Sequence, residues 1–455
     1  MNPQPVYNTA TLPNQLRVIH LPSDAQVVYC GFAIGAGARH EKPGQEGLAH
    51  FCEHVSFKGT QTRSAMQILN RLERVGGDLN AFTNKEDTVF YAAILKEHLP
   101  RAVELLSDLV FRSVYPQQEI DREVEVICDE IESYNDSPAE LIFDEIENYC
   151  FSGHPLGHNI LGTAERVRSF TTADALAFTR RYYQPSNAVF FASGDLSFPR
   201  LLRQLEKTTP NPPSTPSQMI PPSASLNSPP SEGLGEVSAS LNSPPSEGLG
   251  EVPLEGLVEI PSASLNSPPS EGLGEVIVFN KSTHQAHVML GTRAFPFDHP
   301  LRLPLYLLNN LLGGPGMNAR LNVALRERNG LVYTVESSMV SYSDTGLWCT
   351  YFGCDPDDVE KCLRMVKHEL HQLVRQPLTD RQLAAAKQQI KGQIGVAADN
   401  RESYALDMAR TYLHLHRPKD VNHLCQDIDA LTPQQLQQAA AEVFDTHRLA
   451  TLIFR

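Results

Sequence analysis

The stretch GLAHFCEHVSFKGT, residues 47–60, contains two histidines four positions apart, with a glutamate directly before the second. If this stretch is helical, His50, Glu53 and His54 lie on one face, because positions i, i+3 and i+4 are neighbours on a helix. Two neutral imidazoles at that spacing can chelate one divalent ion such as zinc, with Glu53 beside it. The alternative is a surface helix that carries polar residues by chance. A catalytic zinc site takes three protein ligands, so the interpretation requires another ligand elsewhere in the chain.

Candidates for the missing ligand lie in QEIDREVEVICDEIESYND, residues 118–136. Its apolar residues recur at helical spacing, which predicts a helix with one face in the core. Glu123 and Glu130 are seven positions apart and line up beside that face, and Asp129 is adjacent. Most carboxylates on such a helix are simply solvated. Periodicity alone leaves Glu123, Asp129 and Glu130 as alternatives.

An internal repeat divides the rest of the chain. The unit SASLNSPPSEGLGEV occurs identically at 223–237, 238–252 and 262–276, in a segment rich in proline, serine and glycine. That composition predicts a flexible linker at 200–276. On either side, residues 1–199 and 277–455 each mix strand-like runs with long helical ones, and residues 78–95 read as strand. We therefore predict an α+β fold of two homologous domains, each a mostly antiparallel sheet packed with helices.

Charge and composition exclude several classes of function. The 455 residues carry 53 acidic and 38 basic side chains, a net charge of −15, which argues against nucleic-acid binding. Eight cysteines lack any CxxC pair, which favours reduced thiols and a reducing compartment. The N-terminal residues do not resemble a signal peptide, and no apolar run approaches the roughly 18 residues of a membrane span. We expect a cytoplasmic protein without a membrane partner.

The motif His-x-x-Glu-His resembles the signature of the inverzincins, the pitrilysin-type zinc metallopeptidases. The resemblance extends in order through LPNQLRVI, GLAHFCEHVSFKGT, GGDLNAFTNKEDTVFY, EVICDEI and GHPLGHNILGT. It spans both halves and omits the repeat insert, which is a departure from the family. The sequence is most similar to the bacterial two-domain peptidases and to the beta-type subunits of mitochondrial processing peptidase.

The resemblance assigns a role to each matching residue. It implies that His50, His54 and Glu130 bind one zinc ion per chain, that Glu53 is the general base and that Glu123 supports the site from behind. Asn80 and Ala81 match an edge strand to which the substrate adds as a further strand. The second half lacks the zinc motif, but its Arg326 and Tyr333 match a pair that holds substrate and stabilises the oxyanion. We expect the remaining histidine pairs, at 284/287, 368/371 and 414/416, to lie on solvated surfaces.

The function implied is that of a zinc endopeptidase acting on peptides or unfolded protein segments. An alternative is a processing peptidase that removes leader sequences from precursors, and another is a non-catalytic assembly subunit of the same fold. Because long members of the family enclose a chamber with four such domains and this chain supplies two, a homodimer is implied, or a heterodimer with a homologous subunit. Arg326 and Tyr333 would then approach the zinc of the partner chain.

Overall fold

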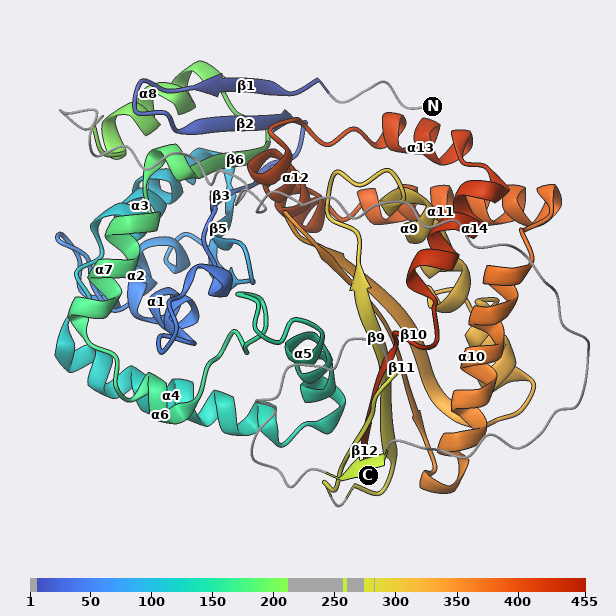
Figure 1. Ribbon diagram of the computed structural model, residues 1–455. Coiled ribbons are helices and arrows are strands. Elements are labelled where there is room, and N and C mark those ends of the chain that lie inside the picture. Colours follow the sequence, from blue (N-terminus) through green and yellow to red (C-terminus); the bar gives the residue numbers. More distant parts are fainter. Residues whose placement is uncertain (1–5, 212–256, 260–273, 282) are drawn as a thin grey trace, which may run out of the picture.

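A computed structural model of the chain describes residues 6–211, 257–259, 274–281 and 283–455 (Figure 1). Most of the predicted linker, including most of the repeats, lies outside the described residues. The predicted boundary at residue 199 falls inside a helix, α8 (Phe198–Thr208). This helix continues the first half because Leu201 and Leu205 are buried in its core.

The first half contains a six-stranded sheet with the strand order β1-β2-β6-β3-β5-β4. Only β2 and β6 pair in parallel, so the sheet is mostly antiparallel as predicted. The strand β4 pairs with β5 alone and forms one edge. The strands are β1 (Asn8–Thr11), β2 (Arg17–Pro22), β3 (Val27–Ile34), β4 (Asp78–Thr83), β5 (Thr88–Leu95) and β6 (Ala188–Gly194).

Helices cover this sheet on the side that carries the histidine motif (Figure 1). Their apolar residues and the sheet form one core, which contains Phe32, Phe51 and Phe90. The helices of the first half are α1 (Leu48–Ser56), α2 (Ala65–Glu73), α3 (Leu99–Arg112), α4 (Gln117–Asn135), α5 (Pro138–Cys150), α6 (Ala164–Val167) and α7 (Thr172–Tyr182), together with α8 and the short turns η1 (Ala38–His40), η2 (Lys96–His98) and η3 (Pro185–Asn187). Of these, α5 packs against the second sheet instead.

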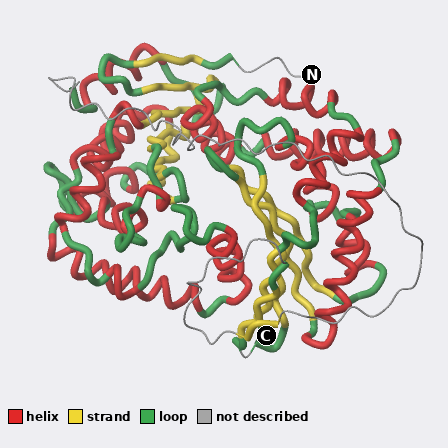
Figure 2. Tube along the Cα trace, viewed as in Figure 1, coloured by secondary structure: helices red, strands yellow, loops and turns green. Residues whose placement is uncertain are grey.

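The second half repeats the plan. Its sheet has the order β10-β11-β9-β12-β8-β7, with β10 at the edge, and its long strands run side by side against a layer of helices (Figure 2). The strands are β7 (Leu257–Glu259), β8 (Val276–Phe279), β9 (Ala286–Ala294), β10 (Val332–Ser341), β11 (Gly346–Cys354) and β12 (Ala450–Phe454). The helices are α9 (Arg302–Gly313), the π-helical turn η5 (Asn322–Glu327), η6 (Pro356–Asp358), α10 (Val359–Arg375), α11 (Asp380–Ala398), α12 (Arg401–Leu415), α13 (Val421–Ala430) and α14 (Pro433–Val443).

The two halves exchange a helix. From the first half, α5 packs Ile142 and Ile146 against the second sheet, and Ile146 lies so close to Gly291 that a Cβ there would meet it at 2.5 Å. From the second half, α12 packs Met408 and Ala409 against the first sheet. Each sheet is therefore covered on one face by a helix from the other half, and the halves are joined through buried apolar surface.

The segment 78–95, which the sequence predicts to be strand, contains two strands. This segment forms the hairpin of β4 and β5, with Asn84 N–H donating to Asp87 O at 2.8 Å to close the turn. The turn between the two strands is difficult to recognise from the sequence, because its residues, NKED, include neither glycine nor proline, the residues that most often mark a hairpin.

Candidate metal centre

The histidine motif lies on α1, which begins one residue after Gly47. Gly47 has a positive φ of 97° and offers no side chain as a cap. The carboxylate of Glu41 takes that role: it accepts hydrogen bonds from the backbone N–H of Gly47 at 3.0 Å and of Ala49 at 2.6 Å. A carboxylate at a helix N-terminus also complements the helix dipole. Glu41 therefore fixes the start of the helix that carries His50, Glu53 and His54.

The third predicted ligand comes from α4, which packs its Ile120, Ile127 and Ile131 stripe into the first core. This orientation turns Glu130 toward α1. Glu130 Oε1 lies 3.8 Å from Nε2 of His50, and its Oε2 lies 3.3 Å from Nε2 of His54. One ligand atom from each of these three residues lies within 4.8 Å of the others.

These distances fit a zinc ion. Four ligands placed tetrahedrally at about 2.0–2.1 Å from zinc lie about 3.3 Å apart, close to the two spacings that Glu130 makes. The donor set of two imidazoles and one carboxylate is that of a catalytic zinc site with one position left for water or substrate. Asp129, the adjacent candidate, is exposed and does not belong to the cluster.

Behind the cluster, Glu123 Oε1 lies 3.1 Å from Nδ1 of His54, and its other oxygen pairs with Lys58 Nζ at 2.5 Å. Burial acts to lower the pKa of His54, but contacts with Glu123 and Glu130 outweigh it and raise this pKa to about 9. Burial and the neighbouring His54 lower the pKa of His50 to about 4. Glu123 and Glu130 thus favour positive charge beside His54, and a bound divalent ion would supply such charge.

Glu53 is 9% exposed and lies on the same face of α1, outside the ligand cluster. Thr83 Oγ1 at the end of β4 donates a hydrogen bond to Glu53 Oε2 at 2.5 Å. Burial raises the pKa of the Glu53 carboxyl, and the Thr83 hydrogen bond opposes this shift. A partly desolvated carboxylate with one oxygen held by a hydroxyl is suited to proton transfer.

The strand β4, which ends at Thr83, also contains Asn80 and Ala81. Both lie on β4, whose outer edge has no strand neighbour among the described residues, and Asn80 is exposed. An extended peptide can add to such an edge through its backbone.

Comparisons with known proteins identify the family of the chain. A family model described as insulinase (peptidase family M16) matches residues 17–164, and a second, described as the peptidase M16 inactive domain, matches residues 169–390. The chain belongs to peptidase family M16. The family explains the two-domain α+β fold, which the sequence predicted correctly.

Individual relatives of this M16 protein extend over nearly its whole length. A protein of Bacillus subtilis named as an uncharacterized zinc protease is 29% identical over 445 residues, 97% of each chain. The crystal structure of a protease from Helicobacter pylori aligns with a TM-score of 0.80 at 20% identity, over 99% of this chain and 100% of the other. A structure from Pseudomonas fluorescens, described as a peptidase M16 inactive domain, aligns with a TM-score of 0.78 at 17% identity, over 99% and 97% of the two chains.

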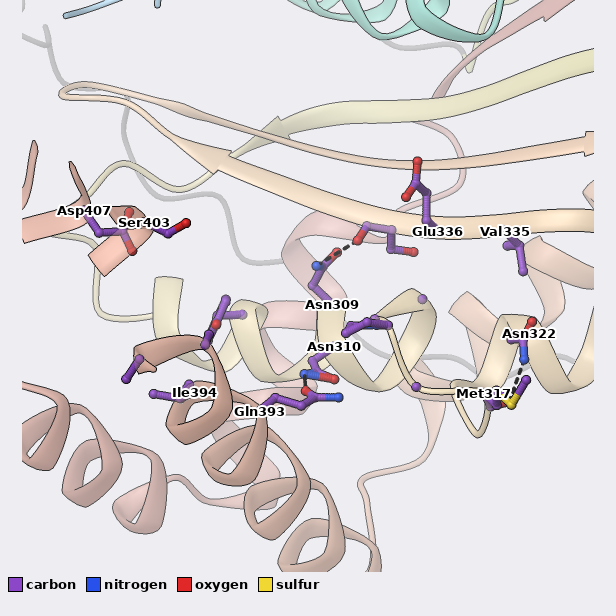
Figure 3. A pocket seen from close by; sticks show the side chains of 18 of the residues that line it. Asn309, Asn310, Met317, Asn322, Val335, Glu336, Gln393, Ile394, Ser403 and Asp407 are labelled. Atoms are coloured by element: carbon purple, nitrogen blue, oxygen red, sulfur yellow. Dashed lines mark hydrogen bonds between the residues drawn. The ribbon is translucent and has the colours of Figure 1, made fainter. Parts of the chain in front are cut away.

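The predicted pair Arg326 and Tyr333 lies in the second half of the M16 chain. Arg326 is in η5 and Tyr333 is the second residue of β10, and both line a pocket of about 670 Å³. Other residues that line this pocket come from α9, β10 and α11 (Figure 3). Tyr333 is 82% exposed. Within the described ranges, no hydrogen bond or ion pair joins either side chain to the zinc-site residues, so the structure of one chain does not bring the pair to that site.

This pocket contains the counterpart of the metal centre. The order of the second sheet repeats that of the first, and α9 and α11 take the places of α1 and α4. Gln393 is fourteenth in the 19-residue α11, as Glu130 is in the 19-residue α4. The side chain of Gln393 accepts a hydrogen bond from Asn310 of α9 (Figure 3). In the first half, Glu130 of α4 contacts His54 of α1 in the same way. The second half therefore has the same arrangement of helices as the metal centre. Because neutral amides are poor zinc ligands, we do not expect it to bind zinc.

Three residues of the metal centre were missed by sequence reasoning: Thr83, Glu41 and Lys58. Thr83 and Lys58 lie within the quoted family motifs, but nothing in a single sequence indicates which hydroxyl or ammonium group faces the site. Glu41 lies seven residues before α1, outside the usual N-cap position at which a capping residue is sought.

The prediction that the other histidine pairs lie on solvated surfaces is wrong for His414. This side chain is mostly buried, lies 3.3 Å from the Asp87 carboxylate and stacks on Phe297. His287 lies 2.8 Å from the hydroxyl of Tyr351, whereas His284 and His368 are exposed. All eight cysteines are free, as expected. Among the described residues, no helix has the length and apolar character needed to cross a bilayer.

Proposed function

We propose that this M16 protein is a zinc-dependent endopeptidase that hydrolyses peptides or unfolded protein segments. The observation that carries the proposal is the convergence of three ligand atoms, from His50, His54 and Glu130, beside the buried carboxylate of Glu53. The relatives named as zinc proteases support it. A non-catalytic assembly subunit is disfavoured because every residue of the expected ligand set and the expected base is present.

His50, His54 and Glu130 would hold the ion, and Glu123 would orient His54 through its second ring nitrogen. A zinc ion in this place supplies Lewis acidity, which polarises the scissile carbonyl and lowers the pKa of water. Glu53 takes the proton from the attacking water and passes it to the leaving amine nitrogen. Thr83 holds one oxygen of Glu53 and leaves the other for this transfer.

The substrate would lie along β4, where the backbone of Asn80 and Ala81 pairs with it as an added strand. Such backbone pairing selects extended or unfolded segments rather than folded surfaces. We propose in addition that the active unit is a dimer, in which Arg326 and Tyr333 of one chain hold the substrate at the zinc site of its partner. The high exposure of Tyr333 supports this arrangement.

The test is hydrolysis of a quenched fluorescent peptide library by the purified protein, by Glu53→Gln and by a matched control, Glu125→Gln, with metal content determined on each. Glu125 is exposed and pairs with Arg168, away from the site. We expect about one zinc per chain in all three proteins and cleavage by the parent and Glu125→Gln alone. Zinc without cleavage in the parent would favour the processing-peptidase alternative, and absence of zinc would refute the proposal.

A further inference from the structure

The turn between β4 and β5 contains three consecutive charged residues that are all buried. Lys85 is 3% exposed, Glu86 is 7% exposed and Asp87 is 1% exposed. Charged side chains are almost never buried to this extent unless they are paired. Each of the three has its own set of partners, and two of these sets include residues from the second half of the chain.

Asp87 is paired with α12. Its carboxylate accepts hydrogen bonds from Arg410 Nε at 3.0 Å and Nη2 at 3.2 Å, and Nε2 of His414 lies 3.3 Å away. Within the turn, Asn84 Nδ2 donates to the same carboxylate at 3.0 Å. The guanidinium and the imidazole hold the pKa of Asp87 below its usual value, against the effect of burial. Arg410 thus holds the turn through a bidentate ion pair, in which two N–H groups of the guanidinium donate to the Asp87 carboxylate.

Glu86 is paired with the loop between β10 and β11. It accepts hydrogen bonds from the backbone N–H of Ser343 at 3.1 Å and from its hydroxyl at 2.6 Å. Arg39 of the first half also donates to Glu86, at 2.6 Å, and to Asp344 of the same loop, at 2.8 Å. The second half therefore contacts the turn at two separate places.

Lys85 is paired within the first half. Its ammonium donates to the backbone carbonyls of Leu156, at 3.1 Å, and of His158. The ring of His158 lies 2.9 Å from the Glu41 carboxylate that caps α1. The motif GHPLGHNILGT thus acquires a structural role, because it connects the turn to the start of the zinc helix.

Thr83 lies directly before this turn and pairs with Thr88 across it. Its hydroxyl donates to Glu53 at 2.5 Å, so a displacement of the turn moves the group that orients the general base. A displacement of about 1 Å in a positioning group can lower the rate of an enzyme about a hundredfold.

We propose that Arg410 of the second half is a positioning residue for Glu53, acting through Asp87, the turn and Thr83. This inference rests on the proposed peptidase function. It gives the half without a zinc motif a part in the chemistry of its own chain, distinct from any contribution to a partner.

The experiment compares Arg410→Met, Arg410→Lys and the parent. Lys391→Met is the matched control, because Lys391 forms an ion pair with Asp429 inside the second half, at 2.6 Å, and within the described residues no hydrogen bond or ion pair joins it to the turn. For each protein we would measure kcat and KM on one cleaved peptide, zinc content, thermal midpoint, and hydrogen–deuterium exchange of a peptide covering residues 83–88.

For Arg410→Met we expect kcat to fall about tenfold or more, with KM and zinc content unchanged and exchange at 83–88 accelerated. Arg410→Lys, which keeps the charge but lacks the paired donors, should recover part of kcat, and Lys391→Met should match the parent. A merely structural role would lower the midpoint and the zinc content together, without this separation of kcat from KM.

Unchanged exchange at 83–88 in Arg410→Met would overturn the proposal, as would accelerated exchange with an unchanged kcat. If Arg410→Met does not fold, Arg410→Lys decides by the same two criteria. A parent that cleaves no peptide refutes the proposed function, and the exchange result then still decides whether Arg410 holds the turn.

Discussion

Glu123 and Glu130 contact opposite nitrogens of one imidazole: Glu123 Oε1 lies 3.1 Å from Nδ1 of His54, and Glu130 Oε2 lies 3.3 Å from Nε2. The two carboxylates are therefore suited to different roles. Glu130 points into the ligand cluster, and Glu123 contacts the ring from behind.

The role of Glu123 predicts a graded loss of metal affinity. In Glu123→Ala, His54 loses the partner of Nδ1, and we expect zinc affinity to fall about 10–100-fold, the usual effect of removing such a support. Competition with a chromophoric chelator measures it. Glu125→Ala, on the exposed face of the same helix, should bind zinc as the parent does. Equal affinity in Glu123→Ala would show that packing alone orients His54.

The choice between Glu130 and Asp129 as the third ligand is tested by an adjacent pair of variants. Glu130→Gln should lose zinc on dialysis, since the cluster retains only two ligands and a weakly coordinating amide. Asp129→Asn should retain about one zinc per chain, because Asp129 is exposed and outside the cluster. Metal analysis of the dialysed proteins decides, and the reverse pattern would transfer the role of ligand to Asp129.

The choice between Glu130 and Asp129 also shows how much of the site can be predicted from the sequence. His50, Glu53 and His54 were predictable because their spacing places them together on any helix. The third proposed ligand was not predictable in this way, because the choice among Glu123, Asp129 and Glu130 depends on how α4 is rotated against α1. That rotation is a tertiary property, set by the burial of Ile120, Ile127 and Ile131, and only the family resemblance selected Glu130.

The remaining features depend on contacts between residues far apart in the chain. The sequence predicted two α+β halves correctly, but an apolar stripe on α5 or α12 does not indicate which sheet it covers. The ion pair and the imidazole contact of Asp87 could not be predicted from the sequence, because Arg410 and His414 are more than 320 residues away from it. The contacts between the two halves therefore cannot be predicted from the local sequence pattern.

Acid should destabilise the protein through His40. Burial lowers the pKa of this histidine to about 4, and its Nδ1 accepts a hydrogen bond from the Gly37 N–H, which requires the neutral ring. The unfolded chain, in which the pKa is near 6.5, binds more protons between these values, so stability falls as pH drops from about 6.5 to about 4. The shift corresponds to about 3 kcal/mol.

Urea unfolding of the parent and of His40→Asn at pH 7 and pH 4.5 measures this contribution. The asparagine oxygen can accept the Gly37 hydrogen bond without titrating, so the difference in unfolding free energy between the two pH values should be smaller in the variant. His284→Asn, which removes an exposed histidine, should leave that difference unchanged. If His40→Asn is as acid-sensitive as the parent, His40 is not the group responsible.

The proposed sharing of sites between chains predicts complementation. Tyr333 is exposed and lies in the pocket of the second half, and within the described residues no hydrogen bond joins it to the proposed zinc ligands of its own chain. We expect Glu53→Gln and Tyr333→Phe each to be strongly impaired alone. A mixed two-fold dimer contains one Glu53→Gln chain and one Tyr333→Phe chain. In one of its two sites, the unaltered Glu53 of the second chain lies beside the unaltered Tyr333 of the first, so this site is intact.

Co-expression in equal amounts should then restore about a quarter of the parent activity, because half of the dimers are mixed and each has one intact site. Arg326→Met mixed with Tyr333→Phe is the matched control: both residues come from the same half, every site receives one altered residue, and no recovery is expected. If Glu53→Gln and Tyr333→Phe also fail to complement while mixed dimers form, Tyr333 does not act at the partner's zinc site.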